Sequence, residues 1–161
     1  MIDLRKYSAF SAVALGMFAS SPGVADDRWS VGVGAGALYS GIGVNLAMRR
    51  DHAFGYLAAG CGASYTSSEG WNFPCGVGAG WIWTDILTQA NDRHGLGIYV
   101  GPVSVDVQPG HDKVNYGAGL TYVYFFQDAV AKGWNLGITP AVGKKYGDHD
   151  WRLLINVGYQ F

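Results

Sequence analysis

The sequence predicts an all-β fold, namely a closed antiparallel eight-stranded transmembrane β-barrel with up-and-down topology. The first observation behind this prediction is alternation: in residues 151–161 every odd position is Trp, Leu, Ile, Val, Tyr or Phe. Alternate side chains of a strand share one face, so this face is fully apolar. The second is charge placement, since several runs carry no charge: 29–48, 95–105, 114–127 and 133–143. A soluble sheet carries charge along its wet face, whereas a membrane barrel confines charge to its rims and lumen.

Eight segments are expected to be strands, because strands of about 10 to 12 residues tilted near 45° cross the hydrocarbon layer. They are 28–37, 40–49, 53–65, 75–86, 95–107, 114–126, 133–143 and 150–161. The first two segments place Trp, Val, Ile, Leu and Met on one face, with Ser, Gly and Asn on the other. The fourth segment places Val and Trp on one face and Gly and Thr on the other. For the third segment, 53–65, the alternation does not decide which residues face outward.

In the second half of the chain, segments 114–126 and 133–143 place Tyr, Leu, Trp and Ile on one face and Asn, Gly and Thr on the other. Segment 150–161 closes the barrel. The dipeptide Gly101-Pro102 predicts a bulge in 95–107, so the phase there also stays open. The interior is expected to be filled by side chains, with glycines allowing tight curvature, because eight strands enclose little space. The expected fillers are Tyr56, Ile82, Tyr99, Phe125 and Leu154, and the expected inward charges are Arg49 and Arg152 alone.

The N-terminal residues predict export. Arg5 and Lys6 precede a mostly apolar run, 8–20, and small residues end at Ala25. This pattern is typical of a secretory signal peptide cleaved after Ala25, and a membrane anchor would need about 20 apolar residues. The expected organisation is therefore a signal peptide, 1–25, and an outer-membrane barrel domain, 26–161. Cleavage would leave nine basic and eleven acidic residues, a balance that argues against a nucleic-acid partner.

An N-terminus released into the periplasm sets the expected direction of every strand. Aromatic side chains then gather at two heights, as in the girdles of membrane barrels. The periplasmic rim would hold Trp29, Trp83, Tyr124, Phe126, Trp134, Tyr159 and Phe161. The outer rim would hold Tyr39, Tyr65, Tyr116 and Trp151.

With its signal peptide, eight alternating strands and terminal Tyr159-Gln160-Phe161, the chain resembles the small OmpA/OmpX-type outer-membrane barrels of Gram-negative bacteria. The resemblance is one of pattern over residues 26–161. It implies that the barrel-assembly machinery reads a C-terminal signal, here Ile155, Val157, Tyr159 and Phe161. The other expected partners are outer-membrane lipid and lipopolysaccharide, and the expected state is a monomer.

The two cysteines are expected to form a disulfide. Cys61 and Cys75 are equidistant from Ser68, so a hairpin centred there places them opposite each other. An oxidising periplasm would join them, whereas two buried free thiols are the alternative. No ligand spacing suggests a metal site beside them.

Chemistry-bearing residues are few. The best site candidate is a pair of neighbouring outer loops carrying His111 and Asp112 in one and Asp148, His149 and Asp150 in the other. Converging imidazoles and carboxylates could hold a cation or act as a general base, although solvated loop residues are the plainer interpretation. No cofactor and no catalytic residue is predicted. The prediction is thus a non-enzymatic envelope protein with a structural or surface-interaction role, and the alternatives are a lipid A-modifying enzyme, a narrow pore or a small-ligand carrier.

Overall fold

The computed structural model describes residues 28–50, 52–66, 70–87, 93–108, 111–129, 132–145 and 148–161. The expected signal peptide, 1–25, lies outside these residues. Within the described part of the chain, no helix has the length and apolar character needed to cross a membrane.

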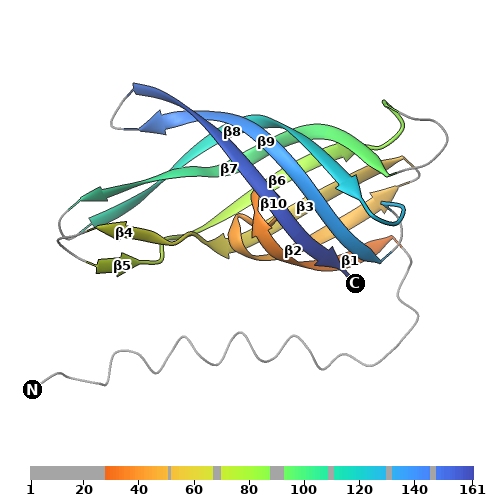
Figure 1. Ribbon diagram of the computed structural model, residues 1–161, viewed down its shortest axis with the longest axis horizontal. Coiled ribbons are helices and arrows are strands. Elements are labelled where there is room, and N and C mark those ends of the chain that lie inside the picture. The colour runs from red at the N-terminus through yellow and green to blue at the C-terminus, as the bar shows by residue number, and fades with distance from the viewer. Residues whose placement is uncertain are drawn as a thin grey trace, which may run out of the picture.

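Eight strands form a closed barrel in which every neighbouring pair is antiparallel (Figure 1). The strands are β1 (Trp29–Gly36), β2 (Gly41–Arg50), β3 (Ala53–Cys61), β6 (Cys75–Trp83), β7 (His94–Gln108), β8 (His111–Phe125), β9 (Gly133–Lys145) and β10 (Asp148–Gln160). Their order around the barrel follows the chain, and β10 returns to β1, where Val33 pairs with Tyr159. The predicted all-β, closed, up-and-down barrel of eight strands is confirmed.

The two ends of the barrel differ. One end, called here the terminal end, holds Trp29 and Phe161, at the start of β1 and just after β10. The other, called the hairpin end, holds the connections β1–β2, β3–β6, β7–β8 and β9–β10, and lies on the left in Figure 1. Beyond β3 and β6, the short strands β4 (Ser64–Thr66) and β5 (Gly70–Asn72) pair as a separate two-stranded sheet.

The barrel exterior is apolar, as the alternation predicts. The interior combines small and polar side chains with a core of large buried ones, among them the expected fillers Tyr56, Ile82, Tyr99 and Phe125. On the exterior, Ile42 is 70% exposed, Leu120 68% and Leu153 64%. In the interior, Asn45, Asn135 and Thr139 are at most 1% exposed. The open phases are also settled: Tyr56 points inward from β3 and Leu57 outward, and the register of β7 shifts between Pro102 and Ser104. At this bulge Val103 turns inward and is buried.

The sequence prediction was wrong for Tyr39, which does not lie in a rim girdle. The turn between β1 and β2 folds into the lumen as a single 3-10 turn, η2 (Ala37–Tyr39), in which Leu38 and Tyr39 are fully buried. Positive φ angles of 105° at Gly36 and 111° at Gly41 let the chain enter and leave this turn. We call residues 37–40 the plug.

Glycines on four strands form a socket for Tyr39. A Cβ on Gly34 or Gly158 would lie within 2.6 Å of the Tyr39 ring, and one on Gly43 or Gly60 within 2.6 Å of its carbonyl oxygen. Side chains at these positions would therefore collide with the plug. The inward glycines provide room for a buried aromatic residue, a role additional to the curvature expected from the sequence.

Buried hydrogen bonds hold the plug in place. The Tyr39 hydroxyl pairs with the Asn135 side chain, whose Nδ2 donates to it over 2.8 Å. The Asn45 amide donates to the Leu38 carbonyl oxygen over 3.1 Å, and the Gln160 amide donates to Asn45 over 2.9 Å. Each buried polar side chain in this group thus has a partner, which is the condition for burying it at low cost.

Candidate functional site at the hairpin end

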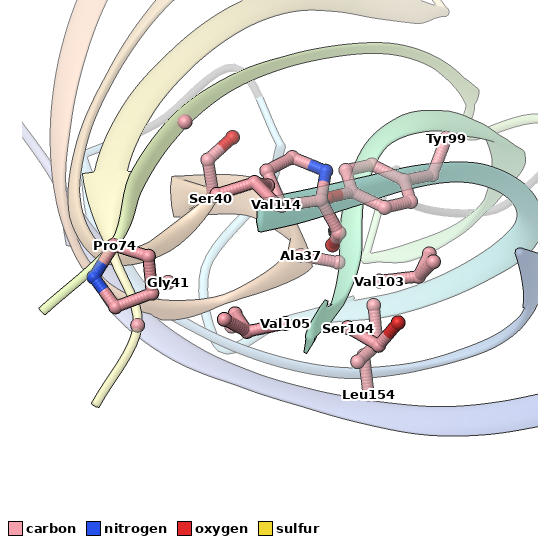
Figure 2. A pocket seen from close by; sticks show the side chains of 14 residues that line it. Ala37, Ser40, Gly41, Pro74, Tyr99, Val103, Ser104, Val105, Val114 and Leu154 are labelled. Carbon is pink, nitrogen blue, oxygen red and sulfur yellow. Dashed lines mark hydrogen bonds between the residues drawn. The ribbon is translucent and has the colours of Figure 1, made fainter. Parts of the chain in front are cut away.

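A cavity of about 150 Å³ lies above the plug at the hairpin end. Ala37 and Ser40 of the plug line it, together with Val103 and Val105 from β7 and Leu154 from β10 (Figure 2). Its lining is mostly aliphatic. The cavity is partly open, and in other proteins enclosed apolar cavities of similar volume accept benzene-sized ligands. The cavity therefore suits a small apolar group better than a charged substrate.

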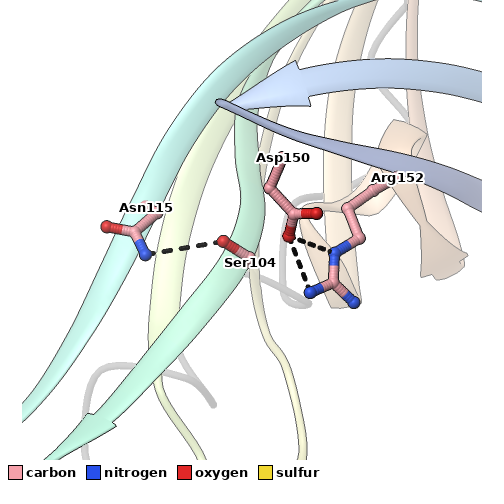
Figure 3. A network of polar contacts seen from close by, with 4 residues as sticks. All are labelled: Ser104, Asn115, Asp150 and Arg152. Carbon is pink, nitrogen blue, oxygen red and sulfur yellow. Dashed lines mark hydrogen bonds and ion pairs between the residues drawn. The ribbon is translucent and has the colours of Figure 1, made fainter. Parts of the chain in front are cut away.

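The polar groups near the cavity are mostly engaged with the protein. The Tyr99 hydroxyl donates to the Pro102 carbonyl oxygen over 2.9 Å. The Asn115 amide donates to the Ser104 hydroxyl over 3.4 Å (Figure 3). The first hydrogen bond links Tyr99 to the bulge in the same strand, β7, and the second links β8 to β7. Together they hold the wall of the cavity in place.

An ion pair lies on the inward face of β10 where this strand rises beyond the cavity. Both Nε and one terminal nitrogen of Arg152 approach the same Asp150 oxygen, each at 2.7 Å (Figure 3). Their side chains remain 42% and 31% exposed, so the pair contributes little to stability. Because Asp150 balances the charge of Arg152 within the same strand, the pair attracts an outside ion only weakly.

Asp106 is a buried charge that the sequence prediction missed. It is 6% exposed and lies opposite Lys113 in the β7–β8 register. The expectation that Arg49 and Arg152 are the only inward charges was therefore wrong. The bulge at Pro102 is the reason for Asp106, because one extra residue moves it from the outer face to the inner face. Alternation along β10 puts Asp150 on the same inward face as Arg152.

The predicted His and Asp residues occupy the tips of two hairpins. His149 pairs with Lys144, and the extended strand places it on the face opposite to Asp148 and Asp150. His111 and Asp112 pair with Gln108 and Val107, but the side chains of His111 and Asp112 lie outside the described part of the structure. Convergence of the two loops stays a prediction. Among described side chains, no three of His, Cys, Asp or Glu are grouped so as to hold a metal ion.

The predicted disulfide is confirmed. Cys61 and Cys75 are paired in the β3–β6 register and joined through their sulfur atoms. Directly above, the Gly62 amide donates to the Pro74 carbonyl oxygen over 2.9 Å. The covalent link therefore holds the base of the β4–β5 hairpin beside the cavity.

The residues of the predicted assembly signal lie along the last strand and just after it. Ile155, Val157 and Phe161 are 62%, 47% and 54% exposed on the barrel exterior. Tyr159 packs edge to face against both Trp134 and Phe161 at the terminal end. Recognition of these residues by an assembly machinery stays a prediction.

The aromatic residues expected at the periplasmic rim gather at the terminal end. Tyr124 packs on Phe126, and it also packs against His94, whose Nδ1 is 2.8 Å from the Tyr122 hydroxyl oxygen. At the hairpin end Tyr116 and Trp151 are exposed as expected. Trp71 in β5 and the nearby Phe73 are exposed as well, which was not predicted.

The plug is the other feature that the sequence prediction missed. A signal for it exists: the turn Ala37-Leu38-Tyr39-Ser40 carries no charge, unlike the connections that follow Arg50 and Phe125. An uncharged, apolar turn is unusual on a wet surface, which is a reason to place it inside.

Comparisons with protein-family models, with curated proteins and with solved structures give no match to this chain.

Proposed function

We propose that this chain is an integral outer-membrane β-barrel protein of the OmpA/OmpX type, non-enzymatic, with a structural or surface-interaction role in the envelope. One observation supports it above the others: large apolar side chains cover the barrel exterior, whereas the polar side chains of the strand centres, such as Asn45, Thr139 and Asn156, face the lumen. Water would be a poor solvent for that exterior, whereas hydrocarbon matches it. Membrane lipid and lipopolysaccharide are then the molecules that surround the barrel.

The plug favours a structural role over a pore. Tyr39 and Leu38 are fully buried inside the lumen, and the hydrogen bond between Tyr39 and Asn135 joins the plug to β9. A small barrel of eight strands has little room left once its interior side chains are placed. The proposal is therefore a closed barrel that acts through its surfaces.

A charged residue in the middle of the exterior belt tests the membrane part of this proposal. Leu120→Arg on β8 should cost about 2–4 kcal/mol in lipid and deplete the protein from the outer-membrane fraction. Lys132→Glu, in an exposed turn between β8 and β9, is the matched control and should fractionate like the wild type. If Leu120→Arg kept the stability of the wild type and stayed in the outer-membrane fraction, the exterior at this position would not be a lipid-facing surface.

A further inference from the structure

The barrel wall has a seam between β6 and β7. Backbone pairing of these strands runs only from Trp83 opposite Leu96 to Ala79 opposite Val100. Beyond that point, residues 75–78 of β6 pair with β3 alone, while β7 continues paired with β8 as far as Gln108. Near the hairpin end, the described backbone thus lacks a ladder between two adjacent strands.

Side chains close this seam. A Cβ on Gly76 would lie 2.6 Å from Pro102 Cγ, which means that the proline ring covers the glycine. The Val77 amide donates to the Tyr116 hydroxyl over 3.4 Å, a long hydrogen bond in place of a ladder bond. Proline has no N–H to donate, so Pro102 cannot restore the ladder. A ring and a phenol can move aside at a far lower cost than a row of backbone hydrogen bonds.

Apolar space lies on both sides of the seam. On the exterior, a groove of about 520 Å³ is lined by Leu57, Val77, Val100 and Tyr116. On the interior, Gly76 and Pro102 line the cavity of about 150 Å³ described above. The residues that form the seam therefore separate a lipid-facing groove from an apolar chamber, and among the side chains that the structure describes no charged one lines either space.

We propose that the seam admits the hydrocarbon chain of a bilayer lipid, which lies in the exterior groove and inserts its end into the cavity above the plug. This proposal rests on the membrane location proposed above. A hydrocarbon end gains free energy from an apolar chamber and demands no hydrogen bond from it. The plug forms the floor of the chamber, so the chain end stops there and does not pass through the barrel.

The test measures nuclear Overhauser contacts from protonated lipid chains to methyl groups of otherwise deuterated protein in lipid nanodiscs. Lipid contacts are expected at Val103, which is only 7% exposed and lines the cavity. Val100, 55% exposed on the exterior, is the positive control, and Val123, fully buried in β8, is the negative control. Contacts at Val100 with none at Val103 would overturn the lipid-entry proposal alone. Absence of contacts at both Val100 and Leu120 would overturn the proposed function.

Two variants test the route. Gly76→Val adds side-chain volume against Pro102, so the Val103 signal should fall to the level of Val123. A folded Gly76→Val barrel that kept the signal would show entry from the aqueous mouth and overturn the lateral route. Tyr116→Phe keeps the ring but removes the acceptor for the Val77 amide, so the Val103 signal should increase. A decrease in that variant would contradict a seam closed by Tyr116.

Discussion

Gly158→Ala is the sharpest test of the plug. A Cβ on Gly158 would lie 2.3 Å from both Cζ and the hydroxyl oxygen of Tyr39. The Tyr39 ring is fully buried and its hydroxyl is bonded to Asn135, so it cannot turn away. Overpacking of this kind costs about 1–3 kcal/mol in a well-packed interior. We expect a loss of that size in the free energy of unfolding.

Removing the ring should remove the clash. Tyr39→Ala alone should cost about 3–5 kcal/mol, because a buried aromatic side chain is lost. In the Tyr39→Ala background, however, Gly158→Ala should cost almost nothing, which gives a coupling of about 1–3 kcal/mol between two residues in contact.

The assay is urea unfolding of the barrel in detergent micelles, followed by tryptophan fluorescence, for the wild type, both single variants and the double variant. Gly62→Ala is the control, since a Cβ there meets no atom within 4 Å. It should change stability by less than about 0.5 kcal/mol. Equal costs of Gly158→Ala in both backgrounds would refute the location of Tyr39 inside the barrel.

Three further predictions follow from the interior and the hairpin end. Tyr39→Phe should lower stability by about 1–3 kcal/mol in the same urea titration, because Asn135 keeps a buried amide that has lost its partner; an unchanged midpoint would contradict the hydrogen bond. Replacing Cys61 and Cys75 together by alanine should cost about 2–3 kcal/mol, and reduction of the wild type should reproduce that loss without affecting the variant. In planar bilayers the wild type should show no steady single-channel current and Tyr39→Ala should show more open events; a wild-type current as large as that of the variant would contradict a closed lumen.

The strands and their faces could be predicted from the sequence because a period of two is a local property. Val31, Leu46 and Ile138 are exposed where their neighbours Ser30, Asn45 and Thr139 are buried, as the alternation indicates. The disulfide was predictable for a similar reason, since the hairpin register follows from the symmetry of its loop.

Contacts between distant strands were not predictable. The position of Tyr39 depends on Gly34, Gly43, Gly60 and Gly158 meeting around one ring, which no single strand reveals. The bulge also limited the prediction: Gly101-Pro102 indicates an irregularity but not the residue that turns inward. Asp106 is buried because of the register shift at this bulge, so its burial was not predicted. His149 and Asp150 were predicted to lie in a loop, where their side chains could converge. They lie instead in β10, and alternation along the strand places them on opposite faces.

The central claim is that hydrocarbon contacts the exterior face carrying Leu120, Ile138 and Leu153. The most direct measurement is the refolding of residues 26–161 from urea, either into phospholipid vesicles or into detergent-free buffer, followed by circular dichroism and heat-modifiable gel migration. We expect a folded, heat-modifiable barrel with vesicles and aggregated chain in buffer. A monomer that folds and stays soluble in buffer without lipid would contradict the claim.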